Sequence, residues 1–184
     1  MEEWYGYSRR RRPGDPELIT LKLRNVFSAA DVIITDRLVN PEIITAHARN
    51  DALVIWAGKQ GYNNKSFSQE EVTALIADYA LQGKKVLRLK GGDVAIFSNM
   101  LDELVALTEN NIPFEIIPGI SAASGASAYT GIPLTARNYS QGVQWLAFNP
   151  NSEYTEEKWN PSLVPEIRWF FIWLQKTWKP SSAN

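Results

Sequence analysis

A glycine pair followed by an acid, Gly91-Gly92-Asp93, stands directly after a segment of alternating apolar residues at 84–90. That alternation is typical of a β-strand. Glycines after a strand let the backbone approach a ligand closely because they carry no Cβ, and open α/β sheets bind ligands beyond the carboxyl ends of their strands. The stretch therefore suggests a binding loop. An ordinary turn uses the same residues, so the stretch alone leaves both interpretations open.

Composition excludes several other kinds of site. The 184 residues include no cysteine, so disulfides, thiolate catalysis and zinc–thiolate sites are excluded. His47 is the single histidine, which rules out a multi-histidine metal site, and no metal is predicted. A net charge of −1 gives no reason to expect nucleic acid or an anionic membrane as a partner. The chain has neither an apolar run of about 18 residues nor a secretory signal, so we expect a cytoplasmic protein.

Strand and helix patterns alternate along most of the chain. The apolar runs predict strands at 32–35, 53–57, 84–90, 113–117 and 143–148. Helical spacing predicts helices at 17–30, 41–49, from Ser68 to just before Gly83, 97–110 and 121–130. Ser68 and Glu71 have the spacing of a capping box. This order predicts an α/β fold with a mostly parallel sheet flanked by helices.

Six motifs in a fixed order carry a resemblance to a known family. They are PGDPELITL, DRLV, GK before a Gly-Tyr, RLKGGD, PFEIIPGISAASGASAY and GIPLT, spread from Pro13 to about Val143. In this order and spacing they resemble the tetrapyrrole methylases, and among them the uroporphyrinogen-III C-methyltransferases most closely. The cofactor site of this family is not a dinucleotide site, and no G-x-G-x-x-G occurs here.

The resemblance implies an S-adenosylmethionine-dependent enzyme with two α/β domains and the cofactor in the cleft between them. It implies methylation of two pyrrole carbons of uroporphyrinogen III, which gives precorrin-2 for sirohaem and cobalamin synthesis. The expected partners are a tetrapyrrole substrate and, for intact members of the family, a second copy in a homodimer. Two alternatives stay open: another methyltransferase of the same fold, and a truncated fragment that catalyses nothing.

Matching motif positions also assign residue roles by resemblance. Asp36 of DRLV corresponds to the family's proposed proton acceptor and Lys59 of GK to its proposed proton donor. The positions expected to contact the cofactor are Pro13, Gly91, Gly92, Asp93, Ile96, Ser121 and Ala122. The chemistry suits these types, because a methylated ring carbon must lose a proton that a carboxylate can take. Asp36 could instead cap the following helix, and Lys59 could be an ordinary loop lysine.

Two motifs depart from the family pattern. The family commonly reads GGDPFIFGRGGEE where this chain reads GGDVAIFSNMLDE, and LTHR is here LTAR, with Ala136 in place of histidine. We interpret both as tolerated variants, which can alter how substrate carboxylates are held.

The two ends of the chain fit the family poorly. We expect residues 1–12 to be an aberrant tail, 13–148 the N-terminal methylase domain, and 149–184 a truncated or out-of-frame start of a second, largely missing domain. Arg9–Arg12 could belong to a frayed tail or a phosphate-binding arm. As a third interpretation, CGN arginine codons read one nucleotide later permit Val-Gly-Ala-Gly, which precedes Pro-Gly-Asp-Pro in the family.

The same shift makes the codons of residues 4–8 compatible with Gly-Thr-Val-Thr-Leu, a plausible first strand. From Glu166, reading two nucleotides later permits Asp-Thr-Met-Val-Phe-Tyr-Met-Ala, close to a strand of the family's second domain. We therefore expect both ends to be translated out of frame, and the resulting polypeptide to be poorly stable and inactive. The nucleotide sequence around these codons tests the hypothesis.

Overall fold

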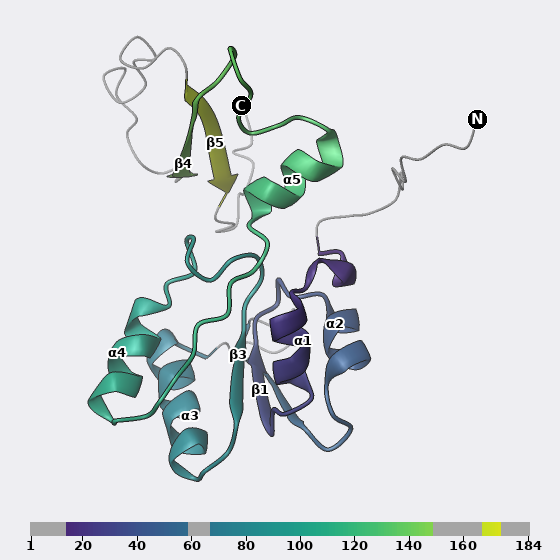
Figure 1. Cartoon of the computed structure of the whole chain (residues 1–184). Coiled ribbons are helices and arrows are strands. Elements are labelled where there is room, and N and C mark those ends of the chain that lie inside the picture. Colours follow the sequence, from purple (N-terminus) through teal and green to yellow (C-terminus); the bar gives the residue numbers. More distant parts are fainter. Residues whose placement is uncertain (1–13, 59–66, 149–166, 174–184) are drawn as a thin grey trace, which may run out of the picture. The chain divides into compact units, whose positions relative to one another are not determined.

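The structure, a computed structural model, describes residues 14–58, 67–148 and 167–173, and for 147–148 and 167–173 the backbone alone. The chain divides into two compact units, Met1–Ser121 and Ala122–Asn184 (Figure 1). The predicted N-terminal domain, 13–148, extends beyond the division of these units after Ser121. The domain assignment stays a prediction. Pro13 and Lys59 lie outside the described residues.

The first unit contains a parallel three-stranded sheet in the order β2-β1-β3 (Figure 1). Val32 at the start of β1 pairs with Leu53 of β2 on one side and Val86 of β3 on the other. The elements in chain order are η1 (Pro16–Leu18), α1 (Leu21–Phe27), β1 (Val32–Thr35), α2 (Pro41–His47), β2 (Leu53–Trp56), α3 (Gln69–Leu81), β3 (Val86–Leu89) and α4 (Leu101–Glu109). The predicted α/β fold with a parallel sheet flanked by helices is confirmed.

Apolar side chains cover both faces of this sheet. On one face, Ile33 and Leu87 pack with Phe27 of α1 and Ile43 of α2 in one buried cluster. On the other face, a second cluster unites two β1 side chains with α3, and it consists of Val32, Ile34, Ala57, Val72 and Ile76. All four residues of β1 are buried, as expected of a parallel strand covered on both sides.

The capping box predicted for α3 is confirmed in both directions. The backbone N–H of Glu71 donates to Ser68 Oγ at 3.2 Å, and the N–H of Ser68 donates to Glu71 Oε2 at 2.7 Å. Gly83 follows the helix with φ +79°, a left-handed conformation that glycine adopts without strain. These two ends fix α3, which brings its apolar residues against the sheet.

Two predicted helices are shorter than expected. The segment 17–30 is divided, because Thr20 is extended and accepts a hydrogen bond from the N–H of Leu23 as the N-cap of α1. The segment 97–110 becomes helical only at Leu101, since Phe97 and Asn99 have φ of 53° and 50°, outside the helical region. The residues before α4 therefore form a loop at the carboxyl end of β3.

The strand predicted at 113–117 is wrong. Residues 112–121 have no regular secondary structure, and within the described residues β3 pairs only with β1. Its apolar residues are partly exposed, with Phe114 at 46% and Ile116 at 43%. An extended segment becomes a strand only when another strand lies within hydrogen-bonding distance, and no strand among the described residues pairs with this segment.

The second unit contains α5 (Ala122–Thr130) and two parallel strands, β4 (Gly142–Phe148) and β5 (Ile167–Trp173), with Gly142 opposite Ile167. Strand β4 was predicted, while β5 was not, because its segment is rich in tryptophan and shows no clear period. In neither unit does a described helix have the length and apolar character needed to cross a membrane.

Candidate functional site

Three loops follow the strands of the first unit, and glycines let them pack closely. A Cβ at Gly58, after β2, would stand 2.8 Å from the backbone nitrogen of Arg37. A Cβ at Gly91, after β3, would stand 3.6 Å from the Cβ of Leu38. The loop that begins with Asp36 therefore lies between the loops after β2 and β3, at the carboxyl edge where α/β sheets bind ligands.

The glycine turn after β3 meets a second backbone segment. A Cβ at Gly119 would stand only 2.2 Å from the carbonyl oxygen of Gly92 and 3.4 Å from the Cα of Asp93. Gly92 has φ +79°, and both Gly91 and Gly92 are exposed. Asp93 Oδ1 accepts a hydrogen bond from the N–H of Ala95 at 2.9 Å, which holds the turn's shape. The result is an accessible backbone cradle without side chains.

Asp36 forms an ion pair with Arg88 and does not cap the helix that follows it. Arg88 donates from Nη2 to Asp36 Oδ1 at 2.7 Å, and the Asp36 side chain remains 34% exposed. The N-cap of α2 is Asn40, whose Oδ1 accepts from the N–H of Glu42 at 3.0 Å. The alternative in which Asp36 caps this helix is therefore wrong. Arg88 therefore orients the carboxylate, which remains partly exposed to solvent.

A buried acid fixes the arginine that holds Asp36. Glu103 of α4 accepts from Arg88 Nε at 3.1 Å, from Gln69 Nε2 at 3.2 Å and, through its other oxygen, from Lys90 Nζ at 3.1 Å. Arg88 also donates from Nη1 to the carbonyl oxygens of Ile34 and Leu89, each at 3.3 Å. Charged groups so deeply buried are stable only when paired. This network fixes the guanidinium between β3, α4 and Asp36.

The structure brings some predicted site residues together and not others. Asp36, Gly91, Gly92 and Asp93 lie on neighbouring loops, and the N–H of Ile96 donates to the carbonyl of Asp93 at 3.1 Å. Ser121 is buried at the end of the first unit, whereas Ala122 begins α5 in the second. The cofactor roles of all these residues stay predictions, as do those of Pro13 and Lys59.

Sequence reasoning missed four residues of this site: Gly58, Arg88, Glu103 and Gly119. The two glycines had a signal, since each belongs to a quoted motif, GK and PGIS. The two charged residues also stand in quoted motifs, Arg88 in RLKGGD and Glu103 at the end of GGDVAIFSNMLDE. Their local patterns hid them, because an arginine in an alternating strand and a glutamate in an amphipathic helix both suggest solvent exposure. Within the described residues, no group of three or more acidic or histidine side chains is placed to hold a metal ion.

Comparison of the sequence with known proteins gives a consistent result. A profile of the Tetrapyrrole (Corrin/Porphyrin) Methylases matches residues 13–163. The siroheme synthase of Pseudomonas putida is 44% identical over 153 residues, which are 83% of this chain and 33% of that protein. The siroheme synthase of Acinetobacter baylyi is 47% identical over 148 residues. The chain thus spans about a third of the length of these curated relatives.

Solved structures agree with the sequence comparison. Uroporphyrin-III-C-methyltransferase from Thermus thermophilus is 34% identical, with a TM-score of 0.62 over 73% of this chain and 56% of that one. The same enzyme complexed with S-adenosylhomocysteine is similar with a TM-score of 0.58, 32% identity and coverage of 73% and 55%. A cobalt precorrin-4 methyltransferase gives 0.68 at 28% identity, over 78% of this chain and 57% of that one.

Proposed function

We propose a function from the premise that this chain belongs to the tetrapyrrole methylase family. The proposed reaction is S-adenosylmethionine-dependent methylation of ring carbons of uroporphyrinogen III, which yields precorrin-2. The first unit would supply the Gly91-Gly92-Asp93 turn and the Asp36 loop to the active site. The chain spans about a third of the length of its curated relatives. The complete reaction is therefore proposed for the whole protein, and the first unit is proposed to supply only part of the active site.

The observation that carries the proposal is the packing of the loop of Asp36 against the bare backbone turn at Gly91 and Gly92. An exposed turn without Cβ atoms suits a cofactor that is held through backbone groups, and Asp93 adds one carboxylate. S-adenosylmethionine, when bound, supplies an electrophilic methyl group. The chain's own task is then to place a nucleophilic ring carbon in line with that group.

Asp36 is proposed to accept the proton that the methylated ring carbon must lose. Its carboxylate is partly exposed, and Arg88 holds it in one orientation at 2.7 Å. A base fixed by a neighbouring group loses less entropy when it meets its proton, which favours transfer. Lys59, the residue after Gly58 in the sequence, is proposed to donate a proton or to pair with a substrate carboxylate.

A second candidate is methylation of a later corrin intermediate. The higher TM-score of the cobalt precorrin-4 methyltransferase favours it, whereas the higher identity of the uroporphyrin-III enzyme favours the first candidate. Competing methylation assays with uroporphyrinogen III and a cobalt precorrin distinguish them. Failure to methylate either substrate would favour a third candidate, a fragment that folds but catalyses nothing.

The test is calorimetric titration of the whole chain with S-adenosylmethionine, with two matched variants. Gly92→Val places a side chain in the proposed cofactor cradle, at a residue with φ +79°. Gly83→Val has the same φ of +79° but lies at the end of α3 with no heavy atom within 4 Å of its added Cβ. Both variants carry similar backbone strain, so the comparison isolates the cradle.

We expect binding by the original chain and by Gly83→Val, and weak or no binding by Gly92→Val, with circular dichroism showing retained helix in all three. Equal affinity of Gly92→Val and Gly83→Val for S-adenosylmethionine would indicate that the glycine turn has only a structural role. Absence of binding by the original chain would contradict the proposed function of this chain as it stands.

A further inference from the structure

Lys90, the residue after β3, connects the loop that follows the glycine turn to the buried charge network. Its Nζ donates to the carbonyl oxygen of Ser98 at 2.7 Å and lies 3.1 Å from Glu103 Oε2. Lys90 and Arg88 are two positions apart, so they lie on the same side of the chain, where both contact Glu103. One buried ammonium therefore contacts both this loop and the acid that holds Arg88.

Asp36 lies at the other end of the same network. Glu103 Oε1 accepts from Arg88 Nε at 3.1 Å, and Arg88 Nη2 donates to Asp36 Oδ1 at 2.7 Å. Positive and negative groups thus alternate along the network, from the ammonium of Lys90 to the carboxylate of Asp36. Because each group is held by the next, loss of one member loosens those beyond it.

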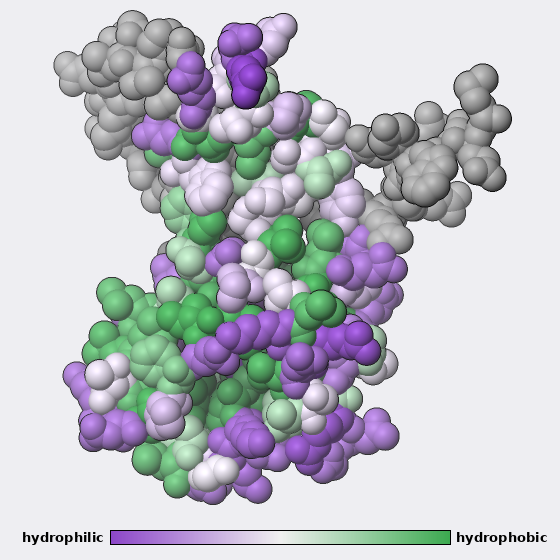
Figure 2. Space-filling model, viewed as in Figure 1, coloured by the Kyte–Doolittle hydropathy of each residue, from purple (hydrophilic) through white to green (hydrophobic). Residues whose placement is uncertain are grey.

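The burial of Glu103 reverses the usual arrangement of an amphipathic helix. Leu101 and Val105 of α4 are 69% and 47% exposed, whereas the Glu103 side chain between them is 6% exposed. Figure 2 shows apolar side chains, in green, gathered on the face of the first unit that carries α4. A buried ion pair is often no more stabilising than well-packed apolar residues of similar volume. Stability alone therefore gives no reason for an acid at this position.

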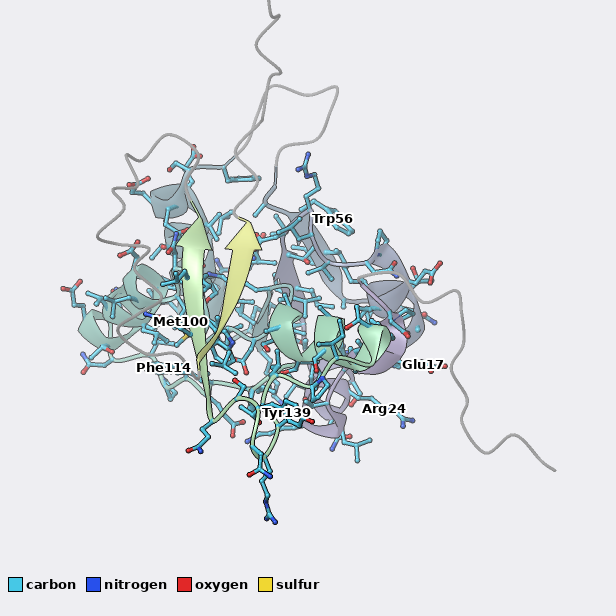
Figure 3. The ribbon with its side chains drawn as sticks, turned by 90° about the horizontal axis from the view of Figure 1, so that it is seen from above. Glu17, Arg24, Trp56, Met100, Phe114 and Tyr139 are labelled. Carbon is cyan, nitrogen blue, oxygen red and sulfur yellow. The ribbon has the colours of Figure 1, made fainter. Side chains whose placement is uncertain are left out.

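The start of α4 has no side-chain cap of its own. Met100, labelled in Figure 3, is the N-cap residue, and its side chain makes no capping hydrogen bond. The loop before it is irregular, with left-handed φ at Phe97 and Asn99. The helix dipole disfavours a cation at this end, so Lys90 does not replace the missing cap. Its hydrogen bond to Ser98 instead fixes the loop between the glycine turn and α4.

We propose that Lys90 is a positioning residue for methyl transfer, which keeps the cofactor turn and the base in a fixed relation. Through Ser98 it holds the loop that follows the glycine turn, and through its partner glutamate it holds the carboxylate of Asp36. A methyl donor and a base must act on the same tetrapyrrole, so a small displacement of either lowers the rate. The inference rests on the proposed function, which assigns the cofactor to the turn and the base to Asp36.

The test uses the full chain with variants of the network and one matched control. Lys90→Met keeps the length of the side chain but removes the ammonium, whereas Glu103→Gln leaves the bond between Lys90 and Ser98 in place. The double variant Lys90→Met/Glu103→Gln removes both charges together, and it replaces Lys90→Met if that chain does not fold. Lys22→Met is the control, because it makes the same substitution at a lysine that pairs with Glu115 on the surface.

Two measurements without cofactor follow the two ends of the network. Hydrogen exchange at the amides of Ala95 and Ile96 reports the turn, because both amides donate to Asp93. The side-chain carboxyl signal of Asp36 in carbon NMR, assigned by its loss in Asp36→Asn, reports the base. Calorimetry then measures the affinity of each chain for S-adenosylmethionine.

In Lys90→Met we expect exchange at both amides to rise by about tenfold or more, and S-adenosylmethionine affinity to fall by about tenfold. The Asp36 signal should shift in the same variant. Glu103→Gln should shift the Asp36 signal but leave the amide exchange as it is. Lys22→Met should change none of these quantities, and the amides of β1 should exchange at the original rate in every variant.

An unchanged Asp36 signal in Lys90→Met overturns the proposal. Exchange that rises equally in β1 and at the turn also overturns it, because Lys90 would then serve only the stability of the fold. If the original chain binds no S-adenosylmethionine, the proposed function fails, while the amide exchange and the Asp36 signal still decide whether Lys90 holds both loops.

Discussion

Lys90, the residue after β3, and Glu103 of α4 form an ion pair of 3.1 Å, and each side chain is only 6% exposed. The same glutamate accepts a hydrogen bond from Arg88, so one buried carboxylate serves two cations. Lys90 also donates to the carbonyl of Ser98 at 2.7 Å. This network joins α4 to the strand that precedes the glycine turn. Through Arg88 it also holds the Asp36 carboxylate in one orientation.

Removal of Glu103 should therefore be costly. Glu103→Ala removes the one carboxylate that two buried cations share, and we expect a loss of about 3–5 kcal/mol in the free energy of unfolding. Urea unfolding followed by circular dichroism measures it. Glu109→Ala, on the exposed last turn of the same helix, should stay within about 0.5 kcal/mol of the original chain. Similar losses in both variants would mean that the network does not stabilise the fold.

Gly119 provides a test of the backbone contact with Gly92. In Gly119→Ala the new methyl group meets the carbonyl oxygen of Gly92, so the two segments must separate. We expect a loss of about 1–3 kcal/mol in stability, typical of overpacking, and weaker S-adenosylmethionine binding. Gly125→Ala is the control, because no heavy atom lies within 4 Å of its added Cβ and alanine favours a helix. Unchanged cofactor affinity in Gly119→Ala would show that the contact between Gly119 and Gly92 is not needed for cofactor binding.

Acid should weaken the junction of β1 and β3 through Asp31. The backbone N–H of Lys85, which donates to Asp31 Oδ2 at 2.9 Å, lowers the pKa of Asp31 below its ordinary value of 3.8, and Arg49 lowers it further. A lowered pKa stabilises the fold at pH above 3.8, and that stabilisation is lost as the pH falls through the folded-state value.

Asp31→Asn removes this titration. We expect its midpoint of thermal unfolding to fall less steeply between about pH 5 and pH 2 than that of the original chain, with lower stability at neutral pH. Glu109→Gln, an exposed acid at the end of α4, serves as control. Parallel pH profiles for Asp31→Asn and the original chain would exclude a role of Asp31 in acid unfolding.

Local patterns were sufficient to predict the three strands of the parallel sheet and the ends of α3. The strands β1, β2 and β3 are short apolar runs between polar residues, and the capping box of Ser68 and Glu71 involves residues close in sequence. Such signals depend on neighbours along the chain, which the sequence displays directly. The family motifs added Asp36 and the glycine turn, which the structure places on adjacent loops.

Features that depend on distant contacts could not be predicted in this way. Residues 113–117 have strand-forming composition, but they form no backbone pairing with β3. Arg88 and Glu103 resemble surface residues in their local patterns, yet tertiary packing buries them as partners. The close approach of Gly119 to Gly92 joins segments far apart in the chain, and no local pattern carries that information.

The last prediction concerns Asp36, the proposed base. It is measured in a chimera in which residues 14–148 replace the matching part of the Pseudomonas putida siroheme synthase, with radioactive methyl transfer to uroporphyrinogen III as readout. Asp36→Asn keeps the shape of the side chain and a carbonyl oxygen for Arg88, but it cannot accept the proton. We expect turnover to fall by about 10²-fold or more, with S-adenosylmethionine affinity unchanged because the glycine turn is intact.

Two control variants complete this experiment. Glu42→Gln, an exposed acid on the first turn of α2, should leave turnover unchanged. Arg88→Lys keeps the positive charge but cannot bridge Asp36 and Glu103 with a planar guanidinium, so it should reduce turnover less than Asp36→Asn does. If Asp36→Asn turns over at the original rate, Asp36 is not the base, and its ion pair with Arg88 serves only to fix the loop after β1.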